Sequence, residues 1–176
     1  KGIFTGVPSG FVELDELTNG WQGGQFIVIG ARPSMGKTAV ALQMLKTAAK
    51  HGVPACMYSL EMSDVSLANR LLLSECDISV ERFRGGELSE DEVLKMHRAA
   101  GVIEKLPVYI DDKPSVTINY IRNHARLMHK RGKCGLIVVD YLQLTGSQVD
   151  NIRNREQEVS NISRTAKIIA KELNVP

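Results

Sequence analysis

Short apolar runs alternate along this chain with segments whose apolar residues recur at helical spacing. The runs lie at residues 26–29, 55–60, 108–110 and 136–139. Their length and apolar character are typical of strands that are buried on both faces of a sheet. Since strands separated by helices pair in parallel, the pattern predicts an α/β fold in which helices flank a mostly parallel sheet.

Three segments between and after these runs carry apolar stripes at the spacing of one helix face. The stripes consist of Val93, Met96, Ala100 and Ile103; of Ile118, Ile121, Ala125 and Met128; and of Val159, Ile162, Ala166, Ile169 and Leu173. We expect all three stripes to face the core. The first of these helices has a marked beginning, because Ser89 and Glu92 have the spacing of a capping box.

Residues 30–38 read GARPSMGKT and stand between the first apolar run and a helix-compatible stretch. A strand, a glycine-containing loop and a helix in this order favour a phosphate-binding loop, in which backbone N–H groups and the positive end of the helix converge on phosphate oxygens. Lys37 is expected to reach the β- and γ-phosphates, and Thr38 to hold Mg²⁺. The expected nucleotide-binding residues of the loop are Ala31, Arg32, Pro33, Ser34, Met35, Gly36, Lys37 and Thr38.

The loop departs from the strict pattern G-x-x-x-x-G-K-[ST] at one position. Ala31 stands where the first glycine belongs, and Gly30 precedes it. Alanine is small, so we expect the loop still to close. A glycine turn followed by a surface lysine is the alternative interpretation, and the flanking strand and helix patterns favour nucleotide binding over it.

Two carboxylates follow apolar runs and are expected to meet the loop at one edge of the sheet. Asp140 ends the run at residues 136–139 and is the expected Mg²⁺ anchor, because ligands of open α/β sheets bind at the carboxyl ends of the strands. Glu61 follows the run at residues 55–60 and is the candidate catalytic base. Spacing alone leaves a second interpretation open, in which Glu61 supports the amino end of a helix that begins near Ser63.

Composition narrows the function classes only slightly. The 22 basic residues nearly balance the 20 acidic ones, for a net charge of +2, so any DNA-binding site must be local. The three cysteines form no C-x-x-C pair, and Cys56 and Cys134 lie in apolar surroundings that favour buried free thiols. No apolar stretch is long enough to span a bilayer, which indicates a cytoplasmic protein without a membrane partner.

The motifs GARPSMGKT, SLEM at residues 59–62 and LIVVDYLQL at residues 136–144 stand in this order before a long helical segment at residues 155–176. Together they resemble the RecA-like C-terminal ATPase domain of bacterial DnaB-type replicative DNA helicases, and the resemblance covers essentially the whole chain. It implies a RecA-like P-loop NTPase fold over residues 1–176, with ATP and Mg²⁺ as cofactors. It also implies that Glu61 is the base that activates water, that Lys37 acts in catalysis and that Arg70 lies against the nucleotide base.

The resemblance further implies an ATP-dependent helicase motor. Members of the family form homohexameric rings around single-stranded DNA, bind ATP between neighbouring subunits, and work with primase and a helicase loader through segments outside this chain. A RecA-like regulatory or recombination ATPase without unwinding activity is one alternative, and the pairing of DYLQL with SLEM argues against it. A non-catalytic scaffold is another, and the presence of Lys37, Thr38, Glu61 and Asp140 argues against that. The sequence identifies no DNA-contacting residue.

Both ends of the chain look cut, since Lys1 is not an initiator and Pro176 stands where an α/β chain begins another strand. In the family that next strand inserts between the phosphate-loop strand and the strand ending in Asp140, so we expect a partial domain, truncated before a central strand. Later family segments supply an arginine finger, worth about a thousandfold or more in rate. The isolated chain is therefore expected to be a weak or inactive ATPase.

Overall fold

The computed structural model describes residues 5–32, 34–114, 116–140 and 152–176, with the side chains of residues 152–155 excepted. No helix in these ranges is long and apolar enough to cross a membrane. In chain order, the elements of these ranges are α1 (Val12–Thr18), α2 (Lys37–Lys50), β1 (Ala55–Ser59), α3 (Asp64–Cys76), α4 (Val80–Gly85), α5 (Glu90–Ile103), β2 (Val108–Asp111), α6 (Ile118–Lys130), β3 (Leu136–Asp140) and α7 (Ile152–Leu173).

The strands form one parallel sheet in the order β2-β1-β3. Ala55 pairs with Val108 on one side and with Leu136 on the other, and Ser59 lies opposite Asp140. All residues of β1, the middle strand of the described sheet, are buried. The predicted α/β fold with a parallel sheet flanked by helices is therefore confirmed, and the runs at residues 55–60, 108–110 and 136–139 supply its strands.

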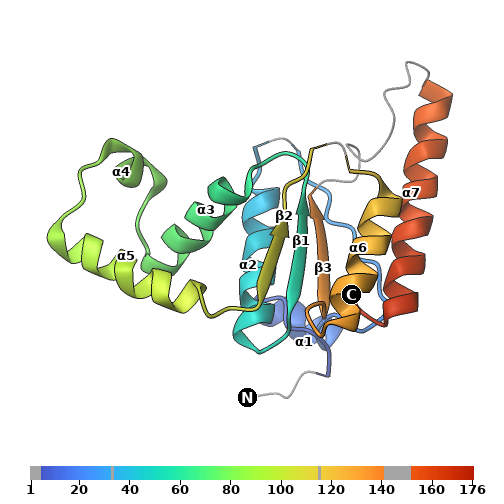
Figure 1. The fold of residues 1–176 in the computed structure, drawn as a ribbon, viewed down its shortest axis with the longest axis horizontal. Helices are drawn as coiled ribbons and strands as arrows, with labels where there is room; N and C mark the ends of the chain where they lie inside the picture. Colours follow the sequence, from blue (N-terminus) through green and yellow to red (C-terminus); the bar gives the residue numbers. More distant parts are fainter. Residues whose placement is uncertain (1–4, 33, 115, 141–151) are drawn as a thin grey trace.

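Helices cover both faces of the sheet (Figure 1). The side chains of β1 alternate between these faces, as the two-residue period of a strand requires. Ala55 and Met57 belong to the core built with α2 and α3. Cys56 and Tyr58 belong to a second core built with α6 and α7. Burial on both faces explains why this strand is a continuous apolar run rather than an alternating one.

Cys56 and Cys134 are both buried and free, as expected. A hydrogen bond to the Cys134 thiol and burial in the core raise the pKa of the Cys56 thiol. Cys56 therefore stays protonated, and it packs as a small apolar side chain.

The predicted strand at residues 26–29 is wrong, because these residues pair with no strand of the described chain. A cavity of about 900 Å³ is lined by these residues and by residues 136–139 of β3. A strand exists only where its backbone N–H and C=O groups bond to a neighbour, and apolar composition alone does not supply one. As a result Val28 is 70% exposed. On the β3 side, the Ile137 N–H group donates to the Pro176 carbonyl over 3.0 Å.

The apolar stripes match the structure to different degrees. The stripe on α6 is confirmed, since the buried residues of this helix are Ile121, Ala125 and Met128. On α7 the expectation fails at Val159, which is exposed because the first turns of α7 extend past the sheet (Figure 1).

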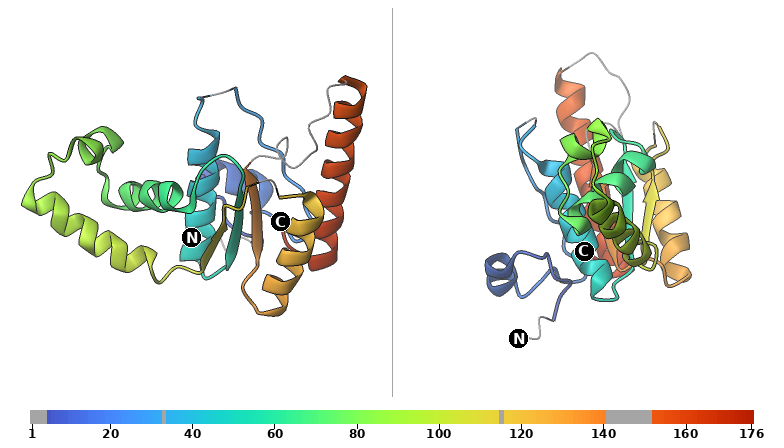
Figure 2. Two further views of the ribbon diagram at one scale, coloured as in Figure 1. Left: turned by 45° about the horizontal axis from the view of Figure 1, so that its top comes forward. Right: turned by 90° about the vertical axis from the view of Figure 1, so that its left-hand side faces the viewer.

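The stripe on α5 fails at Val93 and Ala100, which are both exposed, while Ala99 is buried instead. This helix packs mainly on α3, and together with α4 it extends away from the sheet (Figure 2). Most of its surface therefore meets solvent. The capping box of Ser89 and Glu92 at its amino end is confirmed.

Candidate nucleotide-binding site

The loop before α2 has the backbone geometry of an anion-binding turn. Ser34 and Gly36 adopt positive φ angles of 63° and 85°, and Gly36 precedes the first helical residue, Lys37. Gly36 adopts this left-handed conformation without strain because it has no Cβ atom. The first N–H groups of a helix have no partner within the helix and, with its dipole, favour an anion. The local geometry of the loop therefore suits phosphate.

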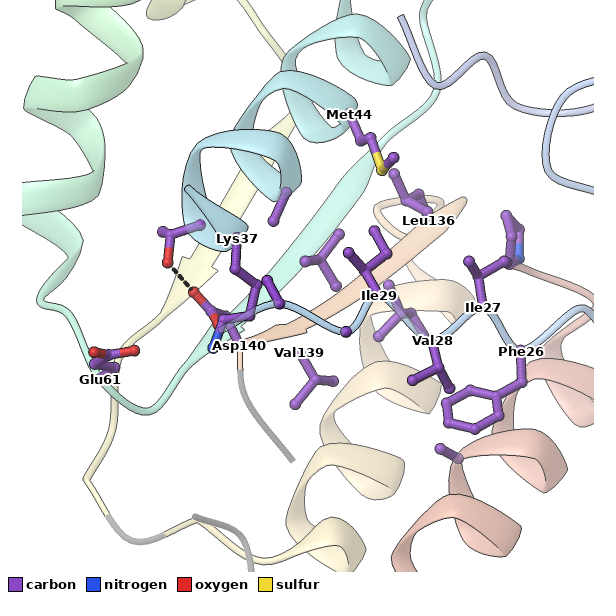
Figure 3. A pocket seen from close by; sticks show the side chains of 18 of the residues that line it. Phe26, Ile27, Val28, Ile29, Lys37, Met44, Glu61, Leu136, Val139 and Asp140 are labelled. Atoms are coloured by element: carbon purple, nitrogen blue, oxygen red, sulfur yellow. Dashed lines mark hydrogen bonds and ion pairs between the residues drawn. The ribbon is translucent and has the colours of Figure 1, made fainter. Parts of the chain in front are cut away.

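Three side chains meet at the carboxyl edge of the sheet (Figure 3). The Thr38 hydroxyl donates to Asp140 Oδ2 over 2.7 Å, and Lys37 Nζ lies 2.9 Å from Asp140 Oδ1. Asp140 is only 3% exposed, so its carboxylate is held by a cation and a hydroxyl in place of water. Because Asp140 ends β3, the contact joins the phosphate loop to the sheet. The structure thus brings together the residues that the sequence predicts as Mg²⁺ anchors and phosphate ligand.

Glu61 lies in the turn between β1 and α3 and lines the same cavity as Lys37 and Asp140. Figure 3 places it to one side of that pair. Within the described residues the Glu61 carboxylate makes no hydrogen bond or ion pair. The helix expected near Ser63 begins at Asp64, with Ser63 as its cap. Arg70, on that helix, lines the cavity too.

The other loop residues fall into three groups. Ala31, Arg32 and Ser34 line the cavity. Met35 does not line it: its side chain is 72% exposed, and its N–H group donates to the Arg32 carbonyl over 3.3 Å. Pro33 lies outside the described residues.

The donor set at this edge fits a magnesium-bound nucleoside triphosphate. The Thr38 hydroxyl and the Asp140 carboxylate are hard oxygen donors of the kind Mg²⁺ prefers, and Mg²⁺ commonly takes only one or two protein ligands alongside substrate phosphates. Lys37 places a cationic donor beside them, which is suited to a phosphate oxygen. The arrangement can bind a polyphosphate and its metal at the amino end of α2.

Sequence reasoning missed one side chain at this site. Ser59, the last residue of β1, is 2% exposed. Its hydroxyl donates to the Met62 carbonyl over 2.7 Å and accepts from the Met62 N–H group over 3.2 Å. The sequence contains a faint signal, a polar residue near the end of an apolar run and two positions before Glu61, and this signal does not specify the hydrogen-bond partner of the hydroxyl.

Comparison with solved structures finds the same fold. A structure described as an ATPase domain matches with a TM-score of 0.90 and 36% identity, over 99% of this chain and 63% of that one. A structure of a DnaB-like replicative helicase and its interactions with primase matches with a TM-score of 0.90 and 35% identity, over 99% of this chain and 42% of that one.

Comparison with curated proteins gives the family. The replicative DNA helicase DnaB of Leifsonia xyli subsp. xyli (strain CTCB07) is 42% identical, over 99% of this chain and 38% of that protein. The replicative DNA helicase DnaC of Bacillus subtilis (strain 168) is 41% identical, over 100% of this chain and 39% of that protein. This chain thus spans about two fifths of the length of these relatives. Since residues 6–176 match the DnaB-like helicase C-terminal domain, the chain belongs to that family.

Proposed function

We propose that residues 1–176 form part of a RecA-like ATPase domain whose ATP hydrolysis drives translocation on single-stranded DNA and duplex unwinding in a replicative helicase. The observation that carries the proposal is the contact of Lys37 and Thr38 with Asp140 at the end of β3, with Glu61 lining the same cavity. Hydrolysis of a triphosphate needs a phosphate-binding cation, oxygen ligands for the metal and a group that orients water. All of these side-chain types lie at this edge.

Each residue has a role in this proposal. The loop N–H groups and Lys37 bind the β- and γ-phosphates, while Thr38 and Asp140 hold Mg²⁺. Bound Mg²⁺ neutralises charge that develops on the phosphate oxygens. Lys37 exchanges its contact with Asp140 for one with phosphate. Glu61 accepts a proton from the attacking water, for which a carboxylate that lines the cavity is suited, and Arg70 lies against the base.

The activity of the whole protein is inferred from its relatives. The curated relatives are replicative DNA helicases, and one related structure is described with its interactions with primase. We infer a cytoplasmic homohexamer on single-stranded DNA that engages primase and a helicase loader through segments outside residues 1–176. We also infer that a further strand of the domain fills the cavity between residues 26–29 and β3.

The proposal is tested on the full-length parent protein. Single-stranded DNA is expected to stimulate ATP hydrolysis, and a forked duplex to be unwound from 5′ to 3′. Hydrolysis that is indifferent to DNA, without strand separation, would support a RecA-like regulatory ATPase instead. For the isolated chain, binding and turnover need separate assays, because a missing arginine finger lowers turnover by about a thousandfold or more while binding can persist.

A further inference from the structure

The turn that carries Glu61 is closed by a single buried side chain. Ser59 ends β1, and its hydroxyl both donates to the Met62 carbonyl, at 2.7 Å, and accepts from the Met62 N–H group, at 3.2 Å. The two hydrogen bonds tie the start of the turn to its end, so the backbone of Leu60 and Glu61 lies inside a closed loop. Serine hydroxyls commonly stabilise turns by such local backbone contacts.

The same turn is attached to the strand that carries the metal anchor. The Leu60 N–H group donates to the Asp140 backbone carbonyl over 2.8 Å, and Ser59 lies opposite Asp140 in the sheet register. The alternation along β1 puts Ser59 on the same face as Met57, which is the face covered by α2. The first residues of the turn are therefore fixed beside Asp140, and the hydrogen bonds of Ser59 determine the path of the backbone that follows.

No side-chain hydrogen bond or ion pair to another described residue holds Glu61 in place. Its carboxylate makes no hydrogen bond or ion pair within the described part of the chain, and the residue is exposed. Its position relative to Lys37 and Asp140 is consequently set by the backbone of the turn. A misplacement of about 1 Å in a reacting group lowers a rate by about 100-fold, so the closure of this turn matters for a base that must meet one water molecule.

We propose that Ser59 is a positioning residue for the reaction of this site: its hydroxyl closes the turn from Ser59 to Met62 and thereby holds the Glu61 carboxylate at the place from which it reaches the attacking water. The proposal rests on the proposed function, in which Glu61 is the base. Ser59 is not among the residues that line the cavity, and it acts only through Glu61. Fixing a reactive group through the residues behind it is a general requirement of precise sites.

A purely structural role predicts a different result. If Ser59 only provides hydrogen bonds for the backbone N–H and C=O groups of Met62, its loss lowers stability without a specific effect on the chemical step. A positioning role makes the effect of Ser59 depend on Glu61. A double-mutant cycle between the two residues separates these cases, because residues that act through one another are not additive.

The experiment compares Ser59→Ala, Glu61→Gln and the double variant in the full-length protein with saturating single-stranded DNA. We expect Ser59→Ala to lower kcat by about 10- to 100-fold, with the KM for ATP and the affinity for a fluorescent ADP analogue nearly unchanged. In the Glu61→Gln background, adding Ser59→Ala is expected to change the residual kcat by less than about twofold. Equal losses in both backgrounds, or a change in KM alone, would overturn the proposal.

Two further variants keep the test decisive. Ser59→Cys keeps the buried volume and replaces the hydroxyl with a weakly hydrogen-bonding thiol. Its kcat is therefore expected to fall as in Ser59→Ala, and it serves as the test if the alanine variant folds poorly. A normal kcat in Ser59→Cys would count against the proposal. Ser89→Ala is the matched control, because it removes a serine hydroxyl that accepts from the Glu92 N–H group on α5. It should leave kcat unchanged.

The failure of this proposal and that of the proposed function are distinguishable. If Glu61→Gln turns over ATP normally, Glu61 is not the base, and the positioning role falls with it. If Glu61→Gln loses turnover while Ser59→Ala behaves like the unmodified protein, the base assignment stands and the role of Ser59 alone is wrong.

Discussion

The paired strands β1 and β3 and the unpaired segment at residues 26–29 are similar in sequence and different in structure. Each is a short apolar run followed by residues of the candidate site. β1 hydrogen-bonds to neighbours on both edges and is buried throughout. Residues 26–29 pair with no described strand, and Val28 and Ile29 are 70% and 41% exposed. An apolar run becomes a strand only where the fold supplies a partner for its backbone.

The difference divides the candidate site into two halves. Asp140 ends the paired strand β3 and Glu61 lies two residues after the end of β1, so the sheet positions their backbone. The phosphate loop follows the unpaired segment, and it is positioned from its other end, by the packing of α2 on the sheet and by the contact of Thr38 with Asp140. Substitutions in the first half are therefore expected to act on the chemical step, and those within residues 26–29 to have little effect on the stability of the 176-residue chain.

The largest effect is expected at the acid that follows β1. Glu61→Gln removes the proton acceptor and keeps the shape of the side chain, so we expect kcat of the full-length ATPase to fall by about 100- to 10,000-fold with nucleotide affinity retained. Steady-state kinetics and an equilibrium titration measure the two quantities. Glu81→Gln, an exposed acid on α4, is the matched control, and near-normal turnover in Glu61→Gln would remove the base role.

A smaller effect is expected on stability, and it allows a direct comparison of β1 with the unpaired segment at residues 26–29. Met57→Ala empties space in a fully buried position of β1 and is expected to lower the free energy of unfolding by about 2–5 kcal/mol. Val28→Ala in the unpaired segment is expected to change it by less than about 0.5 kcal/mol. Urea denaturation of the 176-residue chain measures both.

The longer parent protein sharpens this comparison. If a further strand fills the cavity between residues 26–29 and β3 in the parent protein, Val28 is buried there. Val28→Ala is then expected to lower the free energy of unfolding by about 1 kcal/mol or more, as loss of buried methyl groups does. A Val28→Ala effect as large as that of Met57→Ala in the 176-residue chain itself would mean that residues 26–29 are already part of a packed sheet.

The smallest effect lies outside both regions, at an exposed ion pair between α6 and α7. Arg126 and Arg122 lower the pKa of Glu172 from its ordinary value of 4.5 to about 2. Because the pKa in the folded state is depressed, the ion pair stabilises the fold at pH values above the ordinary pKa of 4.5. This contribution is lost as the pH falls from 4.5 toward 2. Solvent screening keeps it small.

We therefore expect Glu172→Gln to have a slightly lower urea midpoint than the unmodified chain at neutral pH. The difference should shrink as the pH falls below about 4.5. Glu156→Gln, an exposed acid on the same helix, is the control. A difference that grows in acid would contradict the assigned pairing.

The sequence predicts those features that depend on short-range patterns. The strands β1, β2 and β3, the capping box at Ser89 and the meeting of Lys37 with Asp140 all follow from local periodicity and from the rule that parallel strands share a carboxyl edge. Residues 26–29 and the exposed Val93 were not predictable in the same way, because pairing and burial depend on which element lies alongside. Ser59 escaped notice because a hydroxyl at a strand end does not reveal its partner.

The most direct test of the central claim is a titration of the full-length protein with a non-hydrolysable ATP analogue and Mg²⁺. Lys37→Ala removes the cation beside Asp140, and we predict an affinity lower by about 30-fold or more. Lys50→Ala, at the far end of the same helix and paired with Glu75, should bind like the unmodified protein. Equal affinity of the Lys37→Ala variant and the unmodified protein would contradict a nucleotide site at this edge of the sheet.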